Sequence, residues 1–337
     1  MGAPEQSSSA EGSDVSINIK ALPPPAPAAA PTPVIVQINA ALTPAECYWK
    51  LVEAGTAKMK YSWFKLAVGG ILAGMYVSFG FTFCCCAIGL LGNTIYGALA
   101  FPVGLLLIIL CGAELYTGNT CYMFAANIER KAALWHHIKI ISSAWFWNLV
   151  GALIMVQLEK AAQIWAHRED WVHDIAFKKM ALEWHVVLVR GIFANWLVNL
   201  AVFQAVAARD VMGKAIGCWT PITTFVAIGL EHCIANQWLI PMSIYLDPTA
   251  KHPVSITWRN FVAKNLIPAT IGNWIGGAIM VGLMNAAFHG TKINEWKDTA
   301  YDMTVGKVMK KVEDPIERAI DLAAPVCLNR PTEQRYQ

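Results

Sequence analysis

The sequence predicts an all-α integral membrane protein with six transmembrane helices, two of them broken, arranged as an inverted three-helix repeat. Three observations lead to this fold class. Hydrophobic residues make up 56% of the 337 residues and charged residues only 15%, with a mean hydropathy of +0.42. A soluble domain of this length carries more charge. Six apolar runs are long enough to cross a bilayer, and segments of the first half of the chain recur in the second.

The chain begins with a segment that has no globular composition. Residues 1–41 are rich in Ser, Ala and Pro, and they contain the run Pro23-Pro24-Pro25. A cleaved signal peptide requires a basic segment followed at once by an apolar run, and this order is missing here. We expect residues 1–41 to form a disordered arm, residues 42–290 to form the six-span domain, and residues 291–337 to form a tail. A short helix and a solvated segment both fit that tail.

Each predicted span has the length that a transmembrane helix needs. The six runs lie at 64–90, 94–127, 138–158, 184–208, 215–245 and 261–287. An even number of spans places both termini on one side of the membrane. Basic residues near the spans are more numerous on that side, which the positive-inside rule assigns to the cytoplasm. We therefore expect a multi-pass protein of the plasma membrane with cytoplasmic termini.

The second and fifth runs are too long for one helix and carry polar residues at membrane depth. The stretch 114–120 interrupts the second run, and Glu231, His232 and Asn236 interrupt the fifth. Backbone leaves a helix inside a bilayer only where protein or a water-filled cavity satisfies its polar groups. Two paired breaks therefore indicate a central pathway.

An internal repeat relates the two halves, in units of about 55–158 and 176–287. Identical residues recur at nearly constant offsets of 121, 117 and 125: Lys58 with Lys179, Gly70 with Gly191, Glu114 with Glu231, Asn119 with Asn236, Asn148 with Asn273, and Gly151 with Gly276. Each unit contains three spans, an odd number, so the second unit enters the membrane from the opposite side. The repeat is therefore predicted to be inverted.

Two lysines and one histidine are the candidate functional residues. Lys58 precedes the first span and Lys179 the fourth, so an inverted repeat places one cation at each mouth of a pathway, where it attracts anions within roughly 8 Å. Anchoring of the helices by these lysines is the alternative. His232 lies in an apolar run at membrane depth, where an ionisable group is functional by default or serves as a hydrogen-bonded structural group. Glu114, Asn119, Glu231 and Asn236 are expected to support the breaks.

Several classes of function are excluded by the residues. No clustered basic face of the kind that binds nucleic acid is present, and no HExxH or CxxC spacing suggests a metal. No nucleophile–base pair or dinucleotide loop suggests an enzyme, and no cofactor is expected. Most cysteines lie in or beside apolar runs, where they pack as small hydrophobic residues. Two interpretations of Arg190 stay open. Its side chain lines a polar vestibule, or it extends outward to the membrane–water interface.

Four motifs carry a family resemblance: Cys111-Gly-Ala-Glu-Leu-Tyr-Thr-Gly-Asn-Thr120, Gly191-Ile-Phe-Ala-Asn195, Glu231-His-Cys-Ile-Ala-Asn236 and Lys264-Asn-Leu-Ile-Pro268. Together they resemble the formate–nitrite transporter family, from about residue 41 to residue 287. The Thr-Gly-Asn-Thr form and the long arm are most similar to the lactate-transporting branch of parasitic protists. Tyr116, Trp196 and Asn199 depart from the family pattern.

The resemblance implies an aquaporin-like fold that assembles as a homopentamer in membrane lipid, with one pathway in each protomer. His232 would be its central histidine, with Thr117 and Asn195 as hydrogen-bond partners, and Lys58 and Lys179 would be the vestibule lysines. The resemblance also implies hydrophobic gates at Phe101, Leu105, Ile108, Leu115, Val198 and Phe225.

The expected function is proton-coupled transport of small monocarboxylates such as lactate and formate. A bare carboxylate crosses an apolar constriction only at high cost, whereas its neutral acid pays a polar-group penalty alone. We hypothesise that the lysines concentrate the anion, that the narrowing vestibule raises its pKa, and that water or His232 supplies a proton. A passive anion or neutral-solute channel is the alternative, although the Asn-Pro-Ala pair of aquaporins is missing. The sequence leaves formate, lactate, nitrite and hydrosulfide open as substrates.

Overall fold

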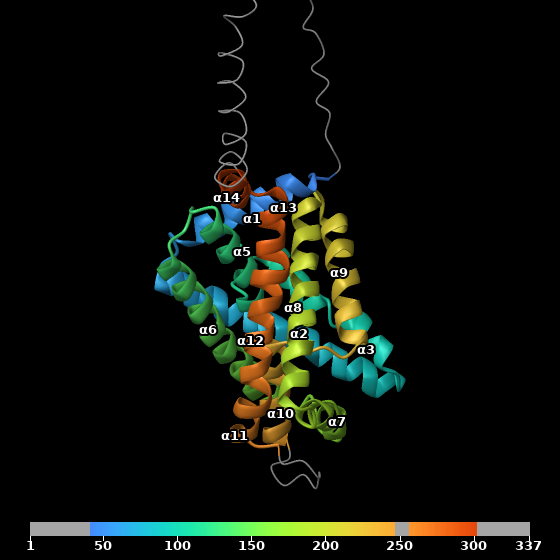
Figure 1. Ribbon diagram of the computed structural model, residues 1–337. Coiled ribbons are helices and arrows are strands. Elements are labelled where there is room, and N and C mark those ends of the chain that lie inside the picture. The colour runs from blue at the N-terminus through green and yellow to red at the C-terminus, as the bar shows by residue number, and fades with distance from the viewer. Residues whose placement is uncertain (1–40, 247–255, 302–337) are drawn as a thin grey trace, which may run out of the picture. The chain divides into compact units, whose positions relative to one another are not determined.

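Helices form the secondary structure of the described residues, 41–246 and 256–301, in the computed structural model (Figure 1). These residues all belong to one unit, Asn39–Gln337. Within them, the sole β pairing is an isolated bridge between Ala41 and Ala208. The predicted all-α class is therefore confirmed. Residues 1–40 of the predicted N-terminal arm, residues 247–255 and the chain after residue 301 lie outside the described residues.

Five helical stretches of the described chain are long and apolar enough to cross a membrane, namely α2 (Trp63–Leu91), Thr94–Cys111, α6 (Leu134–Ala161), α8 (Trp184–Ala207) and Trp258–His289. Large apolar side chains project from these stretches: Phe64 is 78% exposed and Leu90 is 66% exposed. Such surfaces suit a hydrocarbon solvent, which does not penalise exposed apolar groups.

The second predicted run is divided into three helices: α3 (Thr94–Ala100), α4 (Val103–Cys111) and α5 (Tyr116–Ile128). The break lies at 112–115, shorter than predicted, because Thr117 already belongs to the first turn of α5. Gly112 ends α4 with φ of +78°, a left-handed conformation that glycine adopts without steric cost.

The fifth predicted run is broken in the same manner, into α9 (Val211–Ala227) and α10 (Cys233–Leu246). The break spans 228–232, and Gly229 has φ of +70°. Both predicted breaks are therefore present, and each one contains a glycine in the left-handed region. Neither α9 nor α10 reaches the length of a full span, so neither is among the five stretches that are long enough to cross a membrane.

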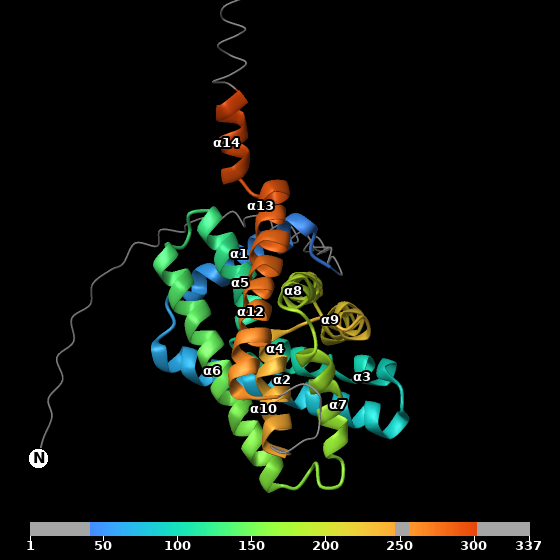
Figure 2. The same cartoon turned by 60° about the horizontal axis from the view of Figure 1, so that its bottom comes forward.

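The last long stretch runs through α11 (Trp258–Asn260), α12 (Ile267–Ile275) and α13 (Met284–His289). Two π-helical segments, η1 (Phe261–Leu266) and η2 (Gly276–Leu283), join these helices. The π-helical turns shift the side-chain register along the stretch. Helix α14 (Lys292–Tyr301) follows, so the beginning of the predicted tail is helical, and Figure 2 shows it extending beyond α13.

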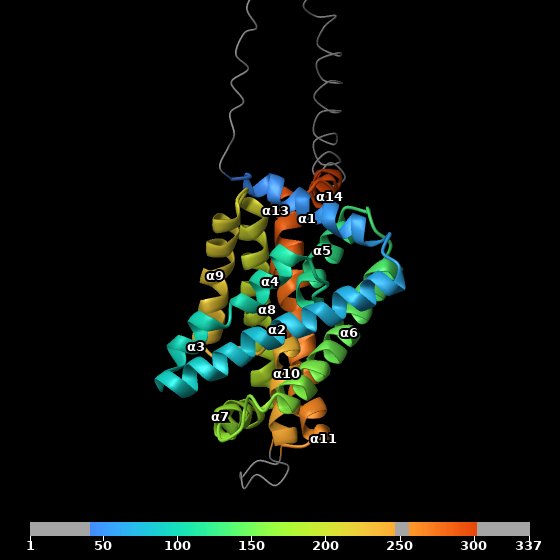
Figure 3. The same ribbon diagram turned by 180° about the vertical axis from the view of Figure 1, so that it is seen from behind.

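Two short helices mark opposite ends of the bundle. Helix α1 (Pro44–Lys58) lies at the top and α7 (Glu169–Met180) at the bottom in Figures 1 and 3. Thr43 and Glu46 form a capping box at the start of α1, and hydrogen bonds from the backbone and hydroxyl of Thr43 lower the pKa of Glu46. Lys58 ends α1, and Lys179 lies in the last turn of α7.

Small residues bring the long helices into close contact. A Cβ added at Gly74 would overlap the backbone of Asn148, and one at Gly151 would overlap Ile71, where α2 packs on α6. A Cβ at Gly276 would overlap Ile192, where the last long stretch packs on α8. These contacts fix the scaffold around the two broken helices.

Candidate functional site

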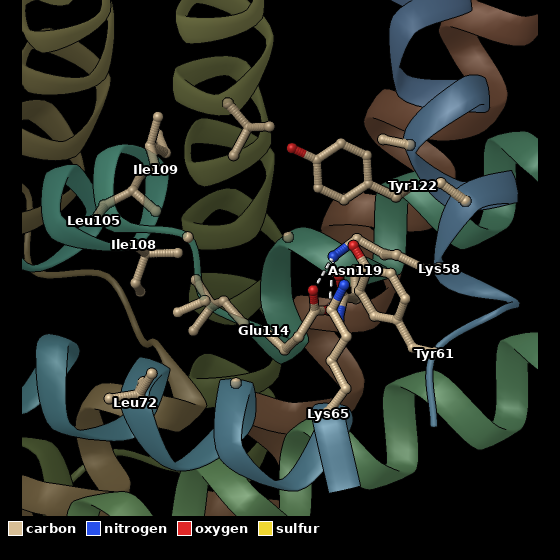
Figure 4. Close-up of a pocket in the computed structure, with 18 of the residues that line it drawn as sticks. Lys58, Tyr61, Lys65, Leu72, Leu105, Ile108, Ile109, Glu114, Asn119 and Tyr122 are labelled. Atoms are coloured by element: carbon tan, nitrogen blue, oxygen red, sulfur yellow. Dashed lines mark hydrogen bonds and ion pairs between the residues drawn. The ribbon is translucent and has the colours of Figure 1, made fainter. Parts of the chain in front are cut away.

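Two cavities approach each other from the ends marked by α1 and α7. The first, here called the Lys58 cavity, has a volume of about 770 Å³, and its lining includes Lys58, Lys65, Glu114 and Tyr122 (Figure 4). Lys214 also lines it. The second, the His232 cavity, has a volume of about 480 Å³ and is lined by Lys178, Lys179, Arg190, Glu231 and His232 among others. Each cavity contains one of the lysines related by the repeat.

A constriction of about 10 Å³ lies between the two cavities. Space of this size holds about one water molecule. Its lining consists of apolar residues and a single imidazole: Val77, Phe101, Gly104, Leu105, Leu115, Val198, Ile222 and His232. A solute that passes from one cavity to the other therefore meets one polar side chain within an apolar layer.

The predicted gate residues gather at this layer, and each of their side chains is buried. Phe101, Leu105, Leu115 and Val198 line the constriction itself. Ile108 lines the Lys58 cavity next to the layer. Phe225 lines the His232 cavity, and its ring lies 5.7 Å from that of Phe101.

Sequence reasoning missed Val77, Gly104 and Ile222, which complete the constriction. Val77 and Ile222 are aliphatic residues in apolar helices. Hydropathy cannot distinguish an aliphatic side chain that faces a pathway from one that faces lipid.

His232 ends the break before α10 and is 4% exposed. Its Nδ1 accepts a hydrogen bond of 3.1 Å from the backbone N–H of Ala235. Because Nδ1 is an acceptor, the neutral ring carries its proton on Nε2. That Nε2 lies 3.1 Å from Oγ1 of Thr117, so Nε2–H donates to the hydroxyl. The histidine thus joins the two broken helices through their first turns.

Asn195 contacts the histidine through Thr117 and not directly, which differs from what the family resemblance implies. Its Nδ2 donates to the Thr117 carbonyl at 3.1 Å and to the Thr120 hydroxyl at 3.1 Å, but no hydrogen bond to His232 is found among the described residues. Nδ2 of Asn199 also donates to the Thr117 carbonyl, at 3.2 Å. Asn195 therefore positions the turn that presents Thr117 to the histidine.

Two buried ion pairs stand at the breaks. Nζ of Lys58 lies 2.6 Å from both carboxylate oxygens of Glu114, and Nζ of Lys179 lies 2.8 Å from Oε1 of Glu231. The amide of Asn119 donates to Glu114 at 3.0 Å, and that of Asn236 donates to Glu231 at 2.7 Å. Each predicted lysine is thus paired with the glutamate at the matching repeat position, and its charge is compensated.

The paired asparagines of the repeat stabilise the breaks as well as the packing. Asn148 donates from Nδ2 to the carbonyls of Gly70 and Glu114, and its Oδ1 accepts from the Tyr116 N–H at 2.9 Å. Asn273 donates to the carbonyls of Gly191 and Glu231, and its Oδ1 accepts from the Cys233 N–H at 2.8 Å. Each amide therefore satisfies backbone groups that the break leaves open, in addition to its place in the helix packing.

Two further polar residues can now be placed. Arg190 lines the His232 cavity, where its Nη1 donates to the carbonyl of Gly229 at 3.2 Å. In the sequence, the pair His136-His137 beside Arg130 and Lys131 indicates a solvated interface, but His137 is buried. Its ring is 3% exposed, its Nδ1 lies 2.7 Å from Oδ1 of Asn127, and the indole N–H of Trp274 donates to its Nε2 at 3.3 Å.

Membrane-length helices, two interrupted helices and two cavities that meet at an apolar constriction define a membrane transport protein of the channel or transporter class. Comparison with known proteins identifies the family within this class. The family model for the formate/nitrite transporter matches residues 45–287. The chain therefore belongs to the formate/nitrite transporter family, and it is an integral membrane, multi-pass transport protein rather than an enzyme.

Relatives from several sources are similar to this chain. A probable formate transporter of Methanothermobacter thermautotrophicus is 34% identical over 253 residues, which cover 65% of this chain and 87% of the relative. The uncharacterized transporter YrhG of Bacillus subtilis is 37% identical over 69% of this chain and 88% of its own length. The formate-nitrite transporter of Plasmodium vivax is 28% identical over 73% of this chain and 83% of its own length.

Solved structures have the same fold. One described as an FNT family ion channel superposes with a TM-score of 0.65 at 24% identity, over 73% of this chain and 99% of that one. Another, a pentameric formate channel with formate bound, has a TM-score of 0.59 at 26% identity, over 68% of this chain and 98% of that one. The predicted family and its helical fold are thereby confirmed.

Proposed function

We propose that this protein carries small monocarboxylates, with formate and lactate as its substrates, across the membrane together with protons. The constriction carries this proposal, because His232 is the one polar side chain among the described residues that line it. An anion that enters the apolar layer loses its water, whereas a neutral acid does not take a charge into the layer. Protonation before the constriction is therefore the low-energy route.

The charges of the two cavities favour arrival of the anion. Three lysines and one carboxylate line the Lys58 cavity. Lys178, Lys179 and Arg190 line the His232 cavity together with two carboxylates, Asp174 and Glu231. Each cavity thus has an excess of positive charge and attracts anions. Because Lys58 and Lys179 are already paired with glutamates, this excess comes from the other basic residues.

Within the apolar layer, we propose that the neutral His232 and the Thr117 hydroxyl form a polar contact site for the passing substrate, here called the polar step. Nε2–H donates to Thr117, so the hydroxyl proton is free to point toward a carboxyl oxygen of a passing acid. The proton that neutralises the substrate comes from the water of the cavity or through His232. The gates Phe101, Leu105, Ile108, Leu115, Val198 and Phe225 exclude water and hydrated ions.

The same proposal includes six spans in an inverted repeat, because α9 and α10 together replace the missing sixth stretch and α1 and α7 lie at opposite ends. The matched contacts of Asn148 and Asn273 support the repeat. We also propose a homopentamer with one pathway per protomer, on the strength of the pentameric formate channel to which the chain is similar. Both termini are proposed to face the cytoplasm from the plasma membrane.

A passive anion or neutral-solute channel is the second candidate. The similar structure is titled a formate channel, and His232 is held as a neutral donor because its Nδ1 accepts from Ala235. A fixed neutral donor passes a solute without carrying its proton.

One experiment separates these candidates. The full-length protein in proteoliposomes is given labelled formate or lactate, with and without an imposed proton gradient. Accumulation above the external concentration that collapses on addition of a protonophore is the expected result for proton-coupled transport. Equilibration without accumulation would replace it with the passive channel. No uptake of either substrate would overturn both candidates.

A further inference from the structure

Arg190 of α8 lines the His232 cavity beside the break before α10, and it forms no ion pair with a carboxylate of the described residues. The neighbouring Lys179 is fully engaged, because its Nζ contacts Oε1 of Glu231 at 2.8 Å and the carbonyl of Leu230 at 3.0 Å. The Arg190 guanidinium has one hydrogen bond to the described residues, from Nη1 to the Gly229 carbonyl at 3.2 Å, and no ion pair with them. Arg190 therefore keeps its charge and most of its donors available to the cavity.

The chemistry of a guanidinium suits a carboxylate better than that of an ammonium does. A guanidinium presents five N–H donors in a planar fork that matches two carboxylate oxygens, and it stays charged at any physiological pH. The bond to Gly229 holds one end of this fork at the wall of the cavity. The remaining donors are thus partly ordered before a ligand arrives, which lowers the entropic cost of binding.

The internal repeat makes this arginine unusual. The offset that relates Lys58 to Lys179 is 121, and 190 − 121 = 69, so Gly69 occupies the equivalent position at the other break. A Cβ added at Gly69 would lie only 2.8 Å from Cγ of Glu114. The first break therefore has no room for a side chain where the second break carries a guanidinium.

We propose that Arg190 binds the carboxylate of the substrate in the His232 cavity, so that one entrance of the pathway has a carboxylate site without a counterpart at the equivalent position of the other. This inference rests on the proposed transport of monocarboxylates. Arg190 lies at the break that ends in His232, so the site delivers the substrate to the start of the constriction. The half-saturating substrate concentration then depends on Arg190 at one membrane face only.

The test uses right-side-out and inside-out membrane vesicles from the same cells that express the full chain, with labelled formate as the probe and equal pH on both sides. Arg190→Gln is expected to raise the half-saturating concentration about tenfold in the one preparation that exposes the His232 cavity, which is the loss of one charge-assisted hydrogen bond. The other preparation is expected to keep its wild-type value. Arg190→Lys keeps the charge without the fork and should fall between the wild type and Arg190→Gln.

Arg168→Gln is the control, because it removes one charge from an exposed residue just before α7 that lines neither cavity. It is expected to change the half-saturating concentration by about twofold at most, since exposed charges are screened by salt. Equal increases at both faces for Arg190→Gln, or a lower maximal rate alone, would assign Arg190 to support of the break and overturn the site. Wild-type vesicles without saturable formate uptake would instead count against the proposed function itself.

Discussion

The Thr117 hydroxyl lies 3.1 Å from Nε2 of His232, although the two residues are 115 positions apart in the chain. Thr117 belongs to the first turn of α5, and His232 immediately precedes α10. The contact therefore joins the two broken helices beside the constriction. At an offset of 117, the repeat position of His232 is Leu115 and that of Thr117 is Ile234, so this polar pair occurs once in the described structure.

Replacing Thr117 by valine tests the polar step. The substitution keeps the shape of the side chain but leaves the Nε2–H of His232 without its acceptor, a cost of about 1–3 kcal/mol for a buried group. We expect formate uptake to slow by about tenfold and its dependence on pH to change, with a loss of stability no larger than that cost. Initial uptake rates across a pH series in proteoliposomes measure both effects.

Thr223→Val is a suitable control for that substitution, because the Thr223 hydroxyl is buried in α9 and has no hydrogen-bond partner among the described residues. Its uptake and pH profile are expected to match those of the wild type. If Thr117→Val also matched the wild type, the hydroxyl would have no part in the pathway.

The ion pair at the second break is predicted to stabilise the fold. Glu231 is fully buried, and its carboxylate also accepts from Asn236 at 2.7 Å and from Asn265 at 3.1 Å. Glu231→Gln leaves the Lys179 ammonium unpaired, and breaking such a buried pair costs about 3–5 kcal/mol. Thermal unfolding in detergent should therefore show a clearly lower midpoint for this variant.

The exposed pair between Lys50 and Glu53 on α1 is the comparison for that measurement, with a distance of 2.7 Å and side chains that are 56% and 69% exposed. Pairs of this kind contribute about 0–1 kcal/mol, so Glu53→Gln should barely move the midpoint. Similar midpoints for Glu53→Gln and Glu231→Gln would show that the buried pair does not stabilise the break.

The sequence was sufficient for the breaks and for the lysines and glutamates that belong to them, and the reason is the repeat. Lys58 with Glu114, and Lys179 with Glu231, are polar residues that recur in an apolar background, so their pattern is visible in one sequence. What the pattern did not show is that each lysine binds the glutamate of its own break. Spacing along the chain says which residues correspond, but the contact depends on how α1 and α7 fold back over the bundle.

A glycine beside the site provides a third prediction. A Cβ added at Gly277 would overlap Oγ1 of Thr120 and would lie 2.6 Å from Nδ2 of Asn195 and 2.7 Å from Nδ2 of Asn199. Gly277→Ala should therefore displace the amides that hold the first turn of α5, at an overpacking cost of about 1–3 kcal/mol. A lower unfolding midpoint together with slower formate uptake is the expected result.

Gly118→Ala serves as the control, since its new Cβ would have 3.8 Å to the nearest atom, in the ring of Tyr122. Residue 118 is also helical, so the propensity change favours alanine in both variants. An unfolding midpoint for Gly277→Ala as high as that for Gly118→Ala would contradict the close packing around Asn195.

The apolar part of the pathway and the positions of Arg190 and His137 could not be obtained from the sequence. Val77 and Ile222 line the constriction, but a membrane helix is apolar on every face, so its periodicity does not reveal which face is buried. Arg190 and His137 are single polar residues in apolar helices, and only the packing of neighbouring helices decides that one lines a cavity and the other is buried against Trp274.

The width of the constriction is predicted to set the size of the solute that passes. Val198 lies in α8, is 2% exposed and lines the constriction of about 10 Å³. Val198→Ala removes two methyl groups from this lining, so lactate, which is larger than formate, should gain more than formate does. We expect the ratio of lactate to formate uptake to rise about tenfold, the discrimination that one methylene gives in an apolar pocket.

Val189→Ala makes the same change elsewhere on α8, at a side chain that is 45% exposed and lines none of the cavities described above. Uptake of both labelled substrates is measured for the two variants and the wild type, at equal amounts of protein in proteoliposomes. The ratio should be unchanged in Val189→Ala, because the loss of volume there lies outside the pathway. If Val198→Ala left the ratio unchanged while remaining folded, the layer formed by Phe101, Leu105, Leu115 and Val198 would not be the selectivity barrier, and selection by size would have to occur in one of the cavities.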